Sequence, residues 1–361
     1  MKIVLFEDDR ATARKVQAEI KKHVPRRAEV LTFTPAVTDG NSRAFTYEHR
    51  LAAEIQSQGY GGATLWVTDR DLSKTSGYRG LSESNVSKAA AQLGIPICKY
   101  ARGASDDDVF ERQRSWGDAQ IVLKSSEIAE LGSKVAMLAK GFLAIATKLD
   151  ALLSGNAGRD GVSTPAEMMG RILGHPESAD QIALYASGDQ KMIGEILPFA
   201  ATKKKSQELR KRLPSVLGYW LYDSILRFPG LLVNSVAAAS YLDIAVSHFE
   251  KATVKRLFRV ASYSGPFGDP EDPRWWRRTL DEVLGKAKTG NEFVAQKLKE
   301  RVAHCVDSKT GKRAGYYCMV TKVPVSEENS IGNISWFPPG ADLARVRKDV
   351  YEQLGPWLGL F

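Results

Sequence analysis

The chain has 361 residues, of which 43% are hydrophobic and 26% charged, and its formal net charge is +9. This composition excludes a disordered chain and a small disulfide-stapled scaffold, and the length favours two domains over one. The charge permits contact with nucleic acid without requiring it. Three cysteines without a short pairing motif indicate a reducing compartment and no cysteine-based metal site.

The first half of the chain alternates between strand and helix patterns. We expect strands at residues 2–6, 29–34, 63–68, 97–100 and 119–123. We expect helices at residues 11–23, 45–58, 83–93, 106–116 and 128–153. Unbroken apolar runs such as Ile3-Val4-Leu5-Phe6 are typical of strands buried on both faces of a parallel sheet. The order therefore predicts a doubly wound α/β domain over residues 1–153 with a five-stranded parallel sheet.

Charged residues follow three of these predicted strands directly. The run Glu7-Asp8-Asp9 follows the first strand, Asp69 and Asp71 follow the third, and Lys124 follows the fifth. Ligands of such sheets bind at the carboxyl ends of the strands, where these residues should meet. Adjacent carboxylates repel one another unless a cation lies among them, and oxygen ligands suit Mg²⁺. The alternative for Glu7-Asp8-Asp9 is a solvated turn without a ligand.

Three segments carry a family resemblance, because they occur in order and each lies at the end of a predicted strand. They are Val4-Leu5-Phe6-Glu7-Asp8-Asp9, Thr68-Asp69-Arg70-Asp71-Leu72 and Gly117-Asp118-Ala119-Gln120-Ile121-Val122-Leu123-Lys124. With them, residues 1 to about 150 resemble the receiver domain of two-component response regulators, which has a flavodoxin-like fold. No such resemblance covers the second half of the chain.

The resemblance implies a role for each matching residue. Glu7 and Asp8 correspond to the acids that bind Mg²⁺, and Asp69 corresponds to the phosphoacceptor, which is also a metal ligand. The backbone carbonyl of Asp71 corresponds to a further metal ligand, and Lys124 to the lysine that contacts the phosphoryl group. A carboxylate attacks an anionic phosphoryl group poorly until metal and ammonium offset the charge. The resemblance also implies a histidine kinase or phosphotransfer protein as partner, and a phosphoacceptor signalling protein rather than a dedicated enzyme.

The sequence departs from the receiver pattern at three positions that transmit the signal. Ala101 replaces a hydroxyl residue, Ile121 replaces an aromatic residue, and Ser125 replaces a proline. A methyl group at position 101 cannot hydrogen-bond a phosphoryl oxygen. Two interpretations therefore stay open. The domain accepts a phosphoryl group but lacks the usual switch, or it is a pseudo-receiver that serves as a protein-interaction module without phosphotransfer.

The second half reads as a different kind of domain. A Gly-rich linker is expected at residues 154–165, followed by a mostly helical output domain of unknown type over residues 166–361. Near the end, strands at residues 303–306 and 314–320 should form a β-hairpin, because a polar, turn-forming segment separates them. A third strand at residues 331–337 would complete a small sheet before a final helix at residues 341–354.

One segment of the second half has features of a DNA-binding motif. Residues 234–258 resemble a helix-turn-helix, with small alanines in the first helix and a second helix that would present Lys251, Lys255 and Arg256 to DNA. The alternative is an ordinary pair of packed helices, because alanine-rich helix pairs are common in bundles.

The sequence shows neither a secretory signal nor a membrane-spanning segment. The first apolar run, residues 3–6, is too short for a secretory signal, and charged residues interrupt the apolar region 213–246. We therefore expect a cytoplasmic protein without membrane contact. A homodimer is compatible with the sequence, and nothing in the sequence decides the oligomeric state.

Overall fold

The computed structural model of the chain describes residues 1–35, 47–75, 78, 81–101, 121–124, 127–154, 164–185 and 206–358. Two compact units emerge, one formed by Met1–Met168 with Gly188–Tyr219 and the other by Met169–Ser187 with Trp220–Phe361. The predicted helix at 106–116, Ser125 and most of the predicted linker lie outside the described residues.

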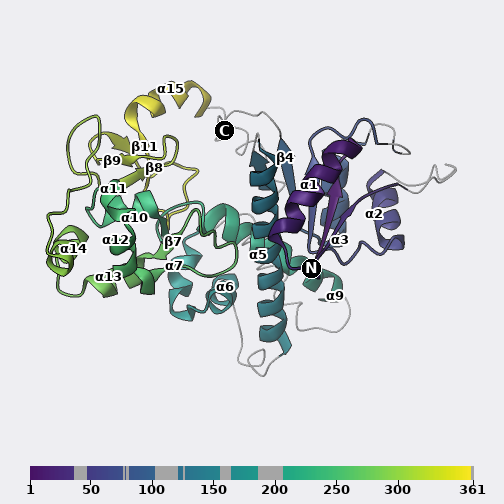
Figure 1. Cartoon of the computed structure of the whole chain (residues 1–361), viewed down its shortest axis with the longest axis horizontal. Coiled ribbons are helices and arrows are strands. Elements are labelled where there is room, and N and C mark those ends of the chain that lie inside the picture. The colour runs from purple at the N-terminus through teal and green to yellow at the C-terminus, as the bar shows by residue number, and fades with distance from the viewer. Residues whose placement is uncertain are drawn as a thin grey trace. The chain divides into compact units, whose positions relative to one another are not determined.

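A five-stranded parallel sheet forms the centre of the first unit (Figure 1). Its strands are β1 (Lys2–Phe6), β2 (Glu29–Thr32), β3 (Leu65–Asp69), β4 (Ile97–Ala101) and β5 (Ile121–Lys124). All neighbouring strands pair in parallel, and the strand order is β2-β1-β3-β4-β5. The predicted doubly wound sheet is therefore confirmed, and its order is that of flavodoxin-like folds.

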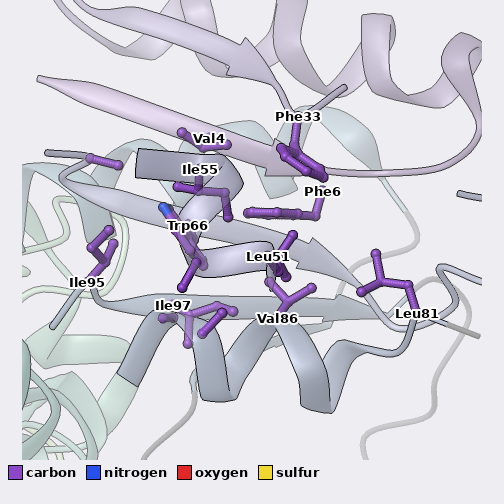
Figure 2. Packing of buried hydrophobic residues seen from close by; sticks show 14 of the residues in the cluster. Val4, Phe6, Phe33, Leu51, Ile55, Trp66, Leu81, Val86, Ile95 and Ile97 are labelled. Atoms are coloured by element: carbon purple, nitrogen blue, oxygen red, sulfur yellow. The ribbon is translucent and has the colours of Figure 1, made fainter. Parts of the chain in front are cut away.

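Helices cover both faces of this sheet. They are α1 (Arg10–His23), α2 (Tyr47–Ser57), α3 (Glu83–Leu93), α5 (Ile128–Ser154) and α9 (Ser206–Tyr219). Side chains alternate between the faces of a strand, so Val4, Phe6 and Trp66 share one face. There they pack with side chains from α2 and α3, including Leu51 and Val86 (Figure 2). Helices α1 and α5 pack against each other and contact β1, β3 and β5, which completes the burial of the strands.

Helix α9 joins this unit although the chain reaches it long after β5. The side chain of Ser215 donates a hydrogen bond to the carbonyl of Gly94, over 2.7 Å. The hydroxyl of Tyr219 accepts from the backbone N–H of Ile97 (2.6 Å) and donates to the carbonyl of the same residue (3.0 Å). Pairing of β4 with β5 begins one residue later, at Cys98. Tyr219 therefore satisfies two buried backbone groups that the sheet leaves open.

The second unit is mainly helical with two small sheets, as predicted in outline. Its helices are α7 (Ala179–Ala183), α10 (Ser235–Tyr241), α11 (Val246–Phe249), α12 (Ala252–Leu257), α13 (Arg277–Leu284), α14 (Gly290–Leu298) and α15 (Lys348–Leu358), and α6 (Pro165–Leu173) spans the division between the units. A π-helical segment covers Trp220–Ile225, and short 3₁₀ turns cover Pro176–Ser178 and Arg259–Ala261. Within the described ranges, no helix is long and apolar enough to cross a membrane.

Its strands differ in detail from the sequence prediction. They are β6 (Leu232–Asn234), β7 (Arg274–Trp276), β8 (Tyr316–Cys318), β9 (Pro324–Val325), β10 (Ser330–Ile331) and β11 (Ala344–Arg347). The larger sheet has the order β10-β11-β8-β9, and β6 pairs with β7. The final helix begins at Lys348 rather than at residue 341, because residues 344–347 alternate buried and partly exposed side chains and form β11. The predicted strand at 331–337 reaches only Ser330–Ile331.

Replacing Tyr219 by phenylalanine should destabilise the edge of β4. The change leaves the buried N–H and C=O of Ile97 without their partner, which should cost about 2 kcal/mol of local stability. Amide hydrogen exchange along β4 measures this cost. The matched control is Tyr60→Phe in the same unit, because the hydroxyl of Tyr60 makes no hydrogen bond with the described residues. Equal exchange in both variants would show that Tyr219 does not hold β4.

Candidate functional site

Three neighbouring strands bring polar side chains to one face of the sheet at its carboxyl edge. Phe6 of β1 pairs with Thr68 of β3, and Asp69 of β3 pairs with Tyr100 of β4. Glu7 lies one residue beyond Phe6 and therefore stands on the same face as Asp69 and Tyr100. Parallel strands that end together thus place a carboxylate, a second carboxylate and a phenol in a row.

Glu7 is the most enclosed of the acids, with 8% of its surface exposed. Its Oε1 atom accepts a hydrogen bond from the backbone N–H of Asp9 over 2.9 Å. Its Oε2 atom accepts a hydrogen bond from the hydroxyl of Tyr100, which is itself buried. Both oxygens of Glu7 are therefore bound by donors of the protein.

The two aspartates that follow Glu7 have separate tasks. The Oδ2 atom of Asp8 accepts from the backbone N–H of Lys74 over 2.7 Å, which ties the loop after β3 to the end of β1. The other oxygen of Asp8 accepts no hydrogen bond from the described residues. Asp9 is the N-cap of α1, since its carboxylate accepts from the N–H of Ala11 (2.9 Å) and the hydroxyl of Thr12 (3.0 Å).

The predicted phosphoacceptor closes β3. The Oδ1 atom of Asp69 accepts from the N–H of Arg70 over 2.7 Å, and Asp69 is partly exposed. In the loop beyond it, the N–H of Ser73 binds the carboxylate of Asp71 at 3.0 Å and holds the pKa of that exposed carboxyl below its ordinary value. Lys124 ends β5 with its backbone opposite Ala101, and its side chain lies outside the described part of the chain.

Mg²⁺ is the cofactor that the sequence predicts for these carboxylates. Mg²⁺ requires several oxygen ligands in near-octahedral geometry. Among the described residues, no group of three or more His, Cys, Asp or Glu side chains is placed to hold a metal ion. Each oxygen of Glu7 already accepts a hydrogen bond from the protein. Binding of Mg²⁺ stays a prediction.

A narrow cleft opens beside Glu7. It has room for roughly one water molecule. Its lining residues are mostly apolar: Phe6, Glu7, Phe33, Leu72, Thr75 and Leu81. A hydrated cation is larger than this space, so a cation that reaches Glu7 from this side must displace side chains.

Sequence reasoning missed two contributions to this edge. Tyr100 was not among the predicted site residues, although the alternation of β4 points it to the same face as Cys98 and hence toward Glu7. Asp9 was treated only as a further carboxylate beside Glu7 and Asp8, although an aspartate directly before a helical pattern is a typical N-cap. The position of Tyr100 beside Glu7 can be predicted only when the strand order is known. The capping role of Asp9 could have been predicted from the sequence.

The structure divides the predicted DNA-binding segment into three short helices. The expected second helix is split into α11 and α12, and α10 is largely buried and contacts β6, β8 and β9. Lys255 forms an ion pair with Glu250, and Lys251 lies 3.9 Å from a carboxylate oxygen of Glu300. Arg256 is exposed. DNA binding by this segment stays a prediction, and two of its three basic side chains face acids of the same unit.

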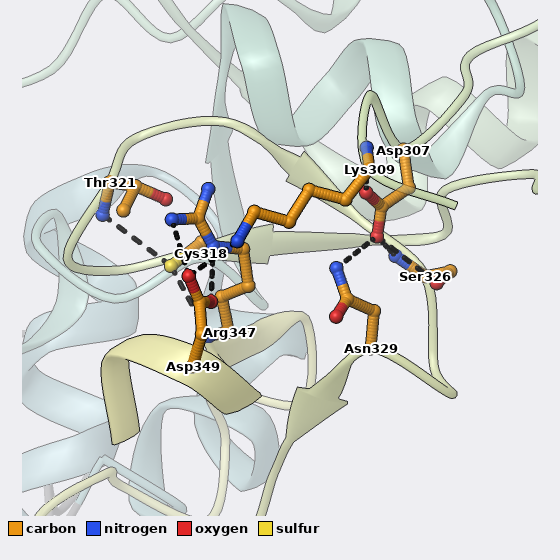
Figure 3. A network of polar contacts seen from close by, with 8 residues as sticks. All are labelled: Asp307, Lys309, Cys318, Thr321, Ser326, Asn329, Arg347 and Asp349. Carbon is orange, nitrogen blue, oxygen red and sulfur yellow. Dashed lines mark hydrogen bonds and ion pairs between the residues drawn. The ribbon is translucent and has the colours of Figure 1, made fainter. Parts of the chain in front are cut away.

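A polar network in the second unit surrounds a buried carboxylate (Figure 3). Asp307 is 1% exposed and accepts from the N–H of Lys309 (2.9 Å), the N–H and hydroxyl of Ser326 (2.9 and 3.1 Å) and the amide of Asn329 (3.0 Å). Burial alone would raise the pKa of Asp307, but these hydrogen bonds outweigh it and lower the pKa. Nearby, Asp349 pairs with Lys309 and Arg347. The network fastens loops to the four-stranded sheet.

Replacing Asp307 by asparagine should destabilise this sheet by about 2–3 kcal/mol, because an amide nitrogen would face donors inside the network. The folded pKa is lowered, so the stabilisation is present above the ordinary value of roughly 3.9 and is lost as the pH falls below it. Hydrogen exchange of β8 and β9 measures both effects. Glu328→Gln is the control, since its exposed pair with Lys312 should contribute under about 1 kcal/mol. A loss no larger in Asp307→Asn than in the control would refute the structural role.

Comparison with known proteins adds no relative to this description. No protein-family model matches the chain, and no curated protein matches its sequence. The parallel sheet with its flanking helices is consistent with a flavodoxin-like fold, and no family match confirms a receiver domain.

Proposed function

We propose that this chain is a receiver-like signalling protein in which Asp69 accepts a phosphoryl group from a histidine kinase or a phosphotransfer protein. The observation that carries the proposal is the position of Asp69. It closes a central strand, is partly exposed, and is flanked by the acids of β1 on one side and by β4 and β5 on the other. The second unit would then be the output domain.

The transfer is an exchange of one phosphorus bond for another. An oxygen of Asp69 forms the new P–O bond while the P–N bond of a phosphohistidine breaks, and the released imidazole takes up a proton. The difficulty is electrostatic, because Asp8 and Asp69 are anions that meet an anionic phosphoryl group. Lys124, at the end of β5, is the residue of this chain expected to offset that charge.

A second interpretation, the pseudo-receiver, is favoured by the state of Glu7. In the structure both of its oxygens are bound by protein donors, which stabilises the edge without any ligand. Position 101 also lacks a hydroxyl with which to bind a phosphoryl oxygen. In this case the domain would keep the receiver-like fold and bind other proteins, but it would not accept a phosphoryl group.

Labelling with a small phosphodonor in the presence of Mg²⁺ separates the two interpretations. The wild-type chain should gain one base-labile acyl phosphate, detected by intact-protein mass spectrometry, and Asp69→Asn should lose it. Asp71→Asn is the matched control and should still be labelled, because its exposed carboxylate binds only the local turn at Ser73.

Two results would count against phosphotransfer to Asp69. Labelling that persists in Asp69→Asn would place the acceptor elsewhere in the chain. A wild-type protein that stays unlabelled under conditions that label a known receiver would favour the pseudo-receiver.

A further inference from the structure

We propose that α3, β4 and α5 together form a helix-binding site, and that α9 is the helix that occupies it. The first unit consists of two separate chain segments, Met1–Met168 and Gly188–Tyr219. Helix α9 therefore reaches this unit only after the chain has passed through part of the second unit. The inference goes beyond the proposed function and does not depend on phosphotransfer to Asp69.

The first step is the face by which α9 binds. Ser215, Gly218 and Tyr219 are spaced by three and four residues, so they lie on one face of the helix. All three are buried, and so are Leu213 and Leu217. Helix α9 packs against α5 and α3. The end of α9 is therefore enclosed by elements from the first half of the chain.

The second step is polar recognition along this face. Ser215 donates a hydrogen bond to the carbonyl of Gly94, which is the left-handed C-cap of α3. Tyr219 binds both the N–H and the carbonyl of Ile97 at the start of β4. The two hydroxyls thus fix the position of α9 along the site. A helix without them would leave buried backbone groups unpaired, which is unfavourable.

The third step is a close approach that only glycine permits. A Cβ atom at Gly218 would lie 2.2 Å from the ring of Phe142 on α5, which is far inside van der Waals contact. The same ring packs edge-on against Tyr219, with ring centroids 5.5 Å apart. Phe142 is itself buried, so its ring has little room to move. The site therefore selects helices that have glycine at this position.

The fourth step is the weakness of α9 as an isolated helix. It spans Ser206–Tyr219 and contains Pro214 in its interior. An internal proline removes a helical hydrogen bond, and short helices are marginally stable in water without tertiary contacts. Helix α9 should therefore owe its helical structure to the site, as a ligand does that folds when it binds.

Site-specific proteolysis of the full chain tests the proposal. A protease recognition sequence is inserted between Ser154 and Thr164, outside the described residues, and the purified protein is cut there. The fragments should stay associated, as measured by analytical ultracentrifugation. Gly218→Ala should weaken their association at least tenfold, a difference equivalent to about 1.4 kcal/mol. Gly62→Ala is the matched control in the same unit and should stay within twofold of the wild type, because a Cβ atom there meets nothing within 4 Å.

A second variant keeps the test decisive if Gly218→Ala fails to fold. Tyr219→Phe removes only a hydroxyl, and it should weaken the association of the fragments by roughly tenfold. Hydrogen exchange of the uncut protein is an independent measurement. Either substitution should speed the exchange of residues 211–219 at least tenfold and leave β8 and β9 of the second unit unchanged.

Separation of the wild-type fragments after the cut would overturn the proposal, because α9 would then not be held by this site. An association within twofold of the wild type in both Gly218→Ala and Tyr219→Phe would also overturn it. Fragments that stay together in the wild type and in Gly62→Ala, but come apart in the α9 variants, would support the helix-binding site whether or not Asp69 is labelled.

Discussion

The hydrogen bond between Tyr100 and Glu7 is the interaction on which the carboxyl edge of the sheet depends. A parallel sheet with both faces covered is dry along its length, and its charged residues collect where the strands end. Glu7 directly follows β1 and is still buried, so its carboxylate needs hydrogen-bond donors. The backbone of Asp9 supplies one and the phenol of Tyr100 supplies the other. The edge is thereby stabilised from within.

Buried polar groups also need hydrogen-bond partners at the opposite end of β4. Ile97 begins this strand before its pairing with β5, and its backbone groups are satisfied by the hydroxyl of Tyr219. Strand β4 is thus held at both ends by tyrosine hydroxyls, one at the acidic edge and one at the end of α9. Tyr219 is the last residue of the first unit, and the second unit continues the chain at Trp220. Loss of the hydrogen bond between Tyr100 and Glu7 would therefore affect the same strand, β4, whose other end is hydrogen-bonded by Tyr219.

The sequence predicted the parallel sheet because its strands are unbroken apolar runs, and β1 has the expected bounds of Lys2–Phe6. It also placed Glu7, Asp8 and Asp69 at one edge, since that follows from parallel strands alone. Tyr100 was beyond reach, because its contact with Glu7 depends on the order in which β1, β3 and β4 lie. The packing of α9 against β4 could not be predicted either, because no local sequence pattern indicates contacts between segments so far apart in the chain. In the second unit, β11 was mistaken for the start of a helix, because four alternating residues are too few to establish a period.

A double-mutant cycle of Glu7→Leu and Tyr100→Phe tests the central claim most directly, because each substitution removes one partner of the hydrogen bond. Stability of the first unit is measured in the wild type, both single variants and the double variant, by hydrogen exchange along β1 and β4. If the buried bond is formed, the two substitutions should be coupled by about 1–3 kcal/mol, with the double variant less destabilised than the sum of the singles. Effects that add within about 0.5 kcal/mol would show that Tyr100 and Glu7 do not interact, and would contradict this account of the acidic edge.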